Sequence, residues 1–90
     1  MKKVRVLIVD DSVYNLHVLE LMLNQYPEIQ PEIMTALNGQ QAVEAVVNNN
    51  MTNPFTHIFM DLHMPVLDGE KATRILRELH ISGQINLDKT

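Results

Sequence analysis

Three aspartates stand directly after apolar runs, and carboxylates in that position can do chemistry. Asp10 and Asp11 follow the run Val4–Val9, and Asp61 follows the run Phe55–Met60. Both runs are short and rich in β-branched or aromatic residues, which is typical of buried strands. If the two strands lie side by side in a parallel sheet, their carboxyl ends meet at one edge and bring the three carboxylates together.

Carboxylates that lie so close repel one another unless a cation lies among them. A small number of oxygen ligands suits Mg²⁺, which keeps several waters and pairs readily with phosphate. A carboxylate beside this ion can act as a nucleophile and form an aspartyl phosphate. Pro65 stiffens the loop that follows Asp61, so that a backbone carbonyl near His63 can also face the metal. The sequence therefore predicts a magnesium site around Asp61.

The segments around these two strands predict the elements that position the aspartates. Ser12 is expected to cap a helix from Val13 to Tyr26, which Pro27 ends. The short, partly alternating run 31–37 predicts a second strand, of the kind found at the edge of a sheet.

Two more helices are predicted further along the chain. Asn38 and Gln41 have the spacing of a capping box and start a helix through residues 42–47, which ends in the turn-forming stretch "NNNMTNP". Asp68 is expected to cap a last helix, whose apolar residues fall at i, i+3, i+4 and i+7: Ala72, Ile75, Leu76 and Leu79. Residues 81–90 have no period and are predicted to form a loop.

Strands that alternate with helices of this length predict an α/β fold, a doubly wound parallel sheet with helices on both faces. The chain has 90 residues, enough for one small domain, and 46% of them are hydrophobic. Aromatic residues make up only 4%, so the core is expected to consist of Leu, Ile, Val and Met.

Composition also narrows the classes of partner. The net charge of −4 argues against a nucleic-acid groove or an anionic membrane surface as the main partner. The absence of cysteine excludes disulfides and thiolate metal sites. No apolar run reaches the length of a signal peptide or a membrane span, so we expect a soluble domain without membrane insertion.

Three motifs in order, "VLIVDDSVYN", "ALNGQQAVE" and "IFMDLHMPVLDG", resemble a response-regulator receiver domain, closest to those of hybrid histidine kinases and phosphorelays. The resemblance covers residues 4–80 and implies a flavodoxin-like fold with strand order 2-1-3. It makes Asp61 the phosphoacceptor and Asp11 a direct Mg²⁺ ligand. Asp10 would hold the metal through water, and the His63 backbone carbonyl would complete the protein ligands.

The resemblance also implies a phosphorylation switch with at most self-phosphorylation and autodephosphorylation, not a metabolic enzyme. The phosphoryl donor would be a phosphohistidine on a histidine kinase or a histidine phosphotransfer protein. The location would be cytoplasmic, including the cytosolic part of a membrane hybrid kinase.

The sequence departs from the family in having three βα units where a complete receiver has five. The family's phosphoryl-binding Ser or Thr after the fourth strand and Lys after the fifth have no position here, and those roles are not carried over to Thr90 or Lys89. Residues 1–80 are therefore expected to form a partial receiver domain, and residues 81–90 a tail that leads toward an absent fourth strand.

Two alternatives remain open from the sequence. One is a non-phosphorylated interaction or decoy module, or an inactive receiver fragment, that keeps the helix 13–26 as a kinase-facing surface. The other is a phosphatase that resembles the haloacid dehalogenases, which has a second aspartate two residues after the nucleophile where this chain has His63. The run 55–60 would also leave an apolar sheet edge open, which predicts association of the chain with itself.

Overall fold

The computed structural model describes residues 4–61, 66–87 and 90. Strands and helices alternate along the chain as the sequence predicts. The elements are β1 (Arg5–Val9), α1 (Val13–Leu23), β2 (Glu32–Ala36), α2 (Gly39–Asn50), β3 (His57–Met60) and α3 (Gly69–Ile81).

The three strands form one parallel sheet in the order β2-β1-β3. The register aligns Val9 at the end of β1 with Ala36 at the end of β2 and Met60 at the end of β3. The predicted strand order 2-1-3 is confirmed. All three strands end at the same edge, and the segments that follow them start there.

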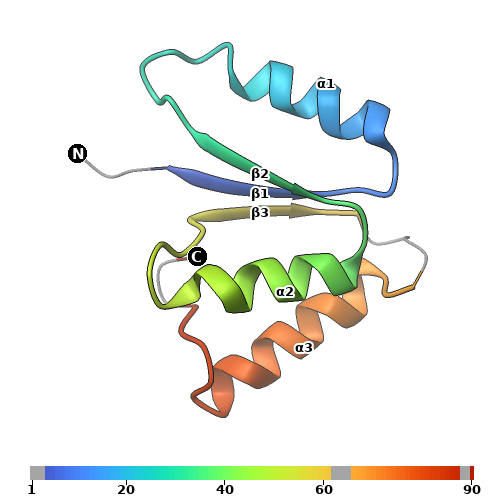
Figure 1. Ribbon diagram of the computed structural model, residues 1–90, viewed down its shortest axis with the longest axis vertical. Coiled ribbons are helices and arrows are strands. Elements are labelled where there is room, and N and C mark those ends of the chain that lie inside the picture. The colour runs from blue at the N-terminus through green and yellow to red at the C-terminus, as the bar shows by residue number, and fades with distance from the viewer. Residues whose placement is uncertain (1–3, 62–65, 88–89) are drawn as a thin grey trace.

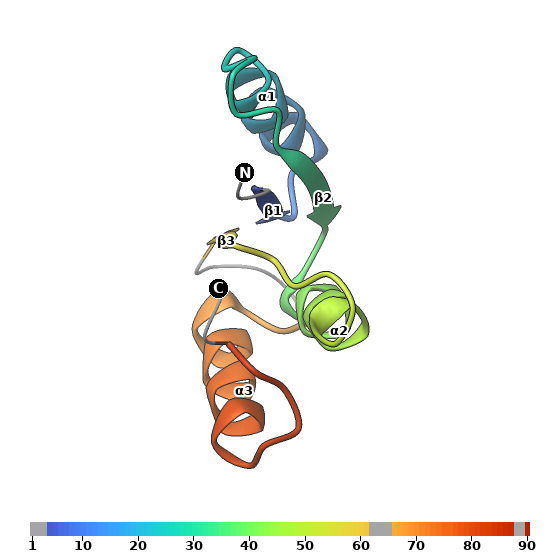
Figure 2. The ribbon, with the colours of Figure 1, turned by 90° about the vertical axis from the view of Figure 1, so that its left-hand side faces the viewer.

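The helices cover both faces of the sheet. Helix α1 lies on one face, and α2 and α3 lie together on the other (Figure 1). Turning the molecule by 90° shows these layers edge-on (Figure 2). Strand β1 is buried along its whole length because it has a strand on each side and helices on both faces. Leu7 and Val9 belong to the core beneath α2 and α3, whereas Val6 and Ile8 pack with Leu16 of α1.

The expected contribution of methionine to the core holds only in part for the residues that the structure describes, because Met60 is partly buried and packs against the core beneath α2 and α3. The fully buried side chains include no methionine, and Met51 is 89% exposed. Met22 and Met34 point outward as well, from α1 and from the edge strand β2. Phe55, just before β3, is the largest side chain that is fully buried.

Two helix ends differ from the prediction. Helix α1 ends at Leu23, three residues before the predicted end, because the chain must leave the α conformation before Pro27. Helix α2 continues to Asn50, where the sequence predicted a turn. The Asn50 side chain is buried, donates to the Asn86 carbonyl oxygen over 2.7 Å and accepts from the Asn86 N–H over 2.7 Å. These two bonds hold the last turn of α2 in place.

Helix α3 includes Ile81, the first residue of the predicted loop, and the described residues after it, 82–87 and 90, form no helix or strand and pack against the domain. Ile85 is buried in the core beneath α2 and α3, and Leu87 packs at its margin. The Thr90 hydroxyl donates to the carbonyl oxygen of Phe55 over 2.7 Å. Thr90 therefore lies beside Phe55, two residues before the start of β3.

Strand β3 pairs with β1 alone among the described strands, so its other edge is open. Phe59 is 49% exposed on the face that α1 covers only in part. An apolar groove runs beside it, lined by Leu23 and Tyr26 among others. The predicted apolar edge is therefore present, while self-association through it stays a prediction. No described helix is both long and apolar enough to span a membrane.

Candidate functional site

The backbone fixes two of the aspartates at the carboxyl edge of the sheet. The Asp10 N–H donates to the Ala36 carbonyl oxygen over 3.1 Å, and the Asp61 N–H donates to the Val9 carbonyl oxygen over 3.0 Å. These bonds extend the sheet by one residue past β1 and past β3. Each aspartate is therefore tied to a neighbouring strand and cannot drift with its loop.

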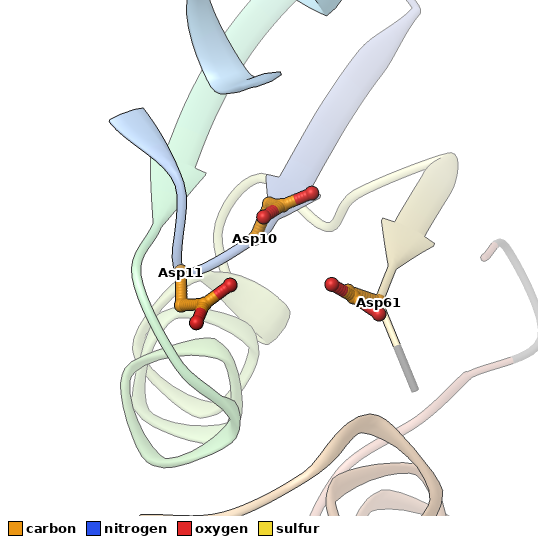
Figure 3. A group of neighbouring side chains, drawn as sticks. All are labelled: Asp10, Asp11 and Asp61. Atoms are coloured by element: carbon orange, nitrogen blue, oxygen red, sulfur yellow. The ribbon is translucent and has the colours of Figure 1, made fainter. Parts of the chain in front are cut away.

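The structure brings Asp10, Asp11 and Asp61 together, and one carboxylate oxygen from each lies within 4.8 Å of the others. Figure 3 shows Asp11 and Asp61 pointing toward one another, with Asp10 beside them at the end of β1. Asp10 and Asp61 are half-buried, whereas Asp11 is exposed. Asp61 lies 50 residues after Asp11 in the sequence, and the pairing of β1 with β3 brings it beside Asp10 and Asp11.

Two donors hold the carboxylate of Asp10. The Ser12 N–H donates to Asp10 Oδ1 over 2.9 Å, and the Asn15 side-chain amide donates to Asp10 Oδ2 over 3.3 Å. Ser12 also caps α1 as predicted, because its hydroxyl oxygen accepts from the Asn15 N–H over 3.3 Å. The start of α1 is therefore built around the first aspartate of the site.

The loop after β3 is anchored where it returns to α2. The Gly39 N–H, at the start of α2, donates to the Leu67 carbonyl oxygen over 2.8 Å. Asp68 then caps α3 as predicted, accepting from the Lys71 N–H over 2.9 Å. His63 and Pro65 lie outside the described residues, so the metal-facing carbonyl at His63 stays a prediction.

The three carboxylates suit a magnesium ion in the chemistry of their donors and in their spacing. Oxygens that share one Mg²⁺ lie about 3–4 Å apart, and the ion keeps part of its water shell. A separation within 4.8 Å is closed by a small side-chain rotation or by one bridging water. The residues Asp10, Asp11 and Asp61 therefore fit this ion, and their role as its ligands stays a prediction.

Two residues at the site were missed by the sequence reasoning. The sequence around Asn15 gives little sign of its bond to Asp10. The one local sign is that Asn15 occupies the third position of the helix, where Glu or Gln is the common residue. Gly39 follows Asn38 in a pair that suggests a turn, yet its importance lies in the contact with Leu67, 28 residues later.

Comparison with known proteins agrees with this geometry. The family model of the response regulator receiver domain matches residues 6–87. Two-component response regulator 24 of Arabidopsis thaliana is 34% identical over 83 residues, which cover 92% of this chain and 55% of that protein.

Solved receiver structures share the fold. The receiver domain of Ssk1 from Saccharomyces cerevisiae, in a co-crystal structure with the histidine phosphotransfer protein Ypd1, superposes with a TM-score of 0.76 at 34% identity. That match covers 89% of this chain and 50% of the other. The response regulator domain of Thermotoga maritima CheB gives a TM-score of 0.69 at 28% identity, over 93% of this chain and 57% of the other.

The chain spans about half the length, or less, of the curated relatives it matches. It covers 55% of response regulator 24 and 8% of a histidine kinase of Arabidopsis thaliana. The matches favour a receiver of two-component phosphorelay systems over a non-phosphorylated interaction or decoy module. Together with the parallel sheet in the order 2-1-3, they show that this chain belongs to the response regulator receiver domain family.

Proposed function

We propose that this chain accepts a phosphoryl group on Asp61 from a phosphohistidine, with Mg²⁺ bound beside it. The observation that carries the proposal is the convergence of Asp10, Asp11 and Asp61 within 4.8 Å, at the strand ends of a chain that belongs to the receiver family. A cation bound among the three carboxylates would offset the repulsion between them.

In the proposed reaction a carboxylate oxygen of Asp61 attacks the phosphorus of the phosphohistidine. The new bond is P–O, the bond that breaks is P–N, and the imidazole leaves with the electron pair and takes up a proton from water. The product is an acyl phosphate on Asp61. The bond from the Asp61 N–H to Val9 keeps the nucleophile at a fixed position, which is the main contribution that phosphoryl transfer requires from the protein.

The metal would be held by Asp10, Asp11, Asp61 and the backbone carbonyl of His63. When bound, Mg²⁺ supplies positive charge that neutralises the equatorial oxygens of the phosphoryl group. Asp11 is the exposed member of the three, so it can reach an ion that enters from solvent. Asp10 contributes from its fixed position beside α1.

The proposed partner is a histidine kinase or a histidine phosphotransfer protein, which would dock on α1. This helix starts two residues after Asp11, so a protein that lies on it also reaches Asp61. Its exposed side includes Val13, Leu21 and Tyr14, which is 75% exposed. Apolar and aromatic side chains of this kind are enriched in protein interfaces.

Docking on α1 can be tested with a matched pair of charge substitutions. Tyr14→Asp should slow phosphoryl transfer from a phosphorylated histidine phosphotransfer protein at least tenfold, because it buries an unpaired charge in the interface. It should leave phosphorylation by a small acyl phosphate unchanged. Met51→Asp, at the far end of α2 and 89% exposed, is the control and should change neither rate. Equal rates for Tyr14→Asp and Met51→Asp with the protein donor would remove α1 from the proposal.

The location we propose is the cytoplasm, where kinases of this system phosphorylate their receivers.

The open edge of β3 and the exposed Phe59 also support association with a second copy of the chain. Sedimentation equilibrium tests this association, and a monomer at all concentrations would refute it.

Phosphorylation itself is tested by intact-mass spectrometry after incubation with Mg²⁺ and a small acyl phosphate. We expect the mass of one phosphoryl group to be gained by the wild type and lost when the metal is chelated. Asp61→Asn should abolish the gain, whereas Asp68→Asn should keep it because Asp68 caps α3 outside the carboxylate cluster. A wild type that gains no mass would favour the non-phosphorylated interaction module instead.

A further inference from the structure

We infer that Asn15 is a positioning residue, whose side-chain amide fixes the Asp10 carboxylate in the orientation that the metal site needs. The inference rests on the proposed magnesium site. Its basis is the pair of bonds to Asp10, from the Ser12 N–H to Oδ1 over 2.9 Å and from the Asn15 amide to Oδ2 over 3.3 Å. Each of the two donors therefore bonds to a different oxygen of the same carboxylate.

Asn15 is not the residue type that would stabilise the start of α1 most. Asn15 is the third residue of α1, and at this position Glu or Gln usually reaches back to the backbone at the start of the helix. Helix α2 shows a related arrangement, because the Gln41 side chain accepts from the N–H of Leu37, one residue before the N-cap Asn38, over 2.9 Å. In α1 the Ser12 N–H is already used by Asp10, and Asn15 turns its amide toward the same carboxylate.

Asparagine is also a poor helix former in comparison with alanine or glutamine. A residue chosen only to stabilise α1 would therefore be a different one. The amide of Asn15 is a donor, which matches the charge of the Asp10 carboxylate, whereas a Glu at this position would add a fourth carboxylate to the cluster. These points assign Asn15 to the site and not to the helix.

The consequence for the site follows from the two bonds. With both oxygens held, the plane of the Asp10 carboxylate is fixed, and each oxygen keeps one lone pair for the ion or for a water bound to it. Without Asn15, the Ser12 N–H is the one donor left to the Asp10 carboxylate among the described residues, and repulsion from Asp11 and Asp61 turns the carboxylate away from the cluster.

Loss of a residue that orients a metal ligand lowers metal affinity by about 10- to 100-fold at buried sites. The bond here is long and lies at the surface, so we expect Asn15→Ala to weaken Mg²⁺ binding by a smaller factor, roughly three- to tenfold. The same substitution should leave thermal unfolding in EDTA unchanged or slightly improved, because alanine favours the helix.

The experiment measures the Mg²⁺ dissociation constant by ¹H–¹⁵N NMR titration of the wild type, Asn15→Ala and Asn48→Ala. Asn48 is an exposed residue of α2 that lies away from the site, so Asn48→Ala makes the same chemical change as a matched control and should bind Mg²⁺ like the wild type. The amide signal of Ser12 gives a second readout without metal. It should shift in Asn15→Ala, because the carboxylate that accepts its proton is no longer held.

The same titration in the Asp10→Asn background tests whether Asn15 acts through Asp10. There the added change Asn15→Ala should weaken Mg²⁺ binding less than twofold further. Equal affinities for Asn15→Ala and wild type, or an unchanged Ser12 signal, would overturn the inference while leaving the magnesium site intact. A fall in stability in EDTA that matches the loss of affinity would also overturn it, in favour of a purely structural role. Absence of saturable Mg²⁺ binding by the wild type would overturn the proposed function and this inference together.

Discussion

Gly39 offers the sharpest test of how the loop after β3 is held beside the site. Its N–H donates to the Leu67 carbonyl oxygen over 2.8 Å, and the residue is buried. A Cβ atom added at this position would lie 2.2 Å from the same oxygen and 3.0 Å from the Ala72 Cβ. The carbonyl would have to retreat by about 1 Å to reach ordinary contact, and the hydrogen bond would stretch with it.

The magnitude of Gly39→Ala follows from three opposing effects. Forcing the backbone of the loop away from α2 costs about 1–3 kcal/mol, as for other overpacked sites. Weakening the hydrogen bond to Leu67 adds about 0.5–1.5 kcal/mol. Replacing the glycine restricts the unfolded chain, which stabilises the folded protein by about 0.4–1 kcal/mol. The two destabilising effects are larger than this gain, so we expect the free energy of unfolding to fall by about 2–3 kcal/mol.

Urea unfolding followed by circular dichroism measures this loss, with two substitutions as controls. Gly83 has a φ of +84° and nothing within 4 Å of an added Cβ, so Gly83→Ala reports backbone strain without a clash and should cost about 1 kcal/mol. Gln40→Ala, exposed and next in the chain, should change stability by less than about 0.5 kcal/mol. A Gly39→Ala protein as stable as the wild type would refute the close approach of α2 to the loop.

Three further predictions concern other parts of the chain. Val66 has a φ of 70° and is 83% exposed, so Val66→Gly should relieve strain and raise the free energy of unfolding by about 0.5–1 kcal/mol in urea. Asn50→Ala removes both bonds to Asn86 from a buried position and should lower that free energy by about 2–3 kcal/mol, whereas the exposed Asn48→Ala should change it little. Asp11→Asn should abolish the rise in melting temperature with Mg²⁺, which for the wild type corresponds to about 1.4 kcal/mol when the ion is at ten times its dissociation constant. An equal rise in Asp11→Asn, measured by differential scanning calorimetry, would contradict its role as a ligand.

The sequence was sufficient for the features that depend on local pattern. The apolar runs before Asp10 and Asp61 are strands, and the caps Ser12, Asn38 and Asp68 start their helices as predicted. Hydrophobic period and capping chemistry act over a few residues, so they can be read from the chain directly. The order of the strands then brings the three carboxylates to one edge.

Features that depend on contacts between distant segments could not be predicted in this way. The run of asparagines at the end of α2 looks like a turn, yet the helix continues to Asn50, whose side chain bonds to Asn86, 36 residues later. The same holds for Gly39, whose need for a bare α-carbon comes from Leu67. Asn15 is only five residues from its partner Asp10, yet its polar side chain looks like that of an ordinary surface residue in the sequence. Only the structure shows the Asp10 carboxylate beside it.

The central claim is that Asp61 carries the phosphoryl group. The most direct measurement treats the protein with Mg²⁺ and a small acyl phosphate, reduces it with borohydride and maps the product by tandem mass spectrometry. Borohydride converts an aspartyl phosphate to homoserine and leaves free carboxylates unchanged. We predict homoserine at position 61 alone, and none when Mg²⁺ is chelated. Homoserine at Asp10 or Asp11, or at no position, would contradict the account.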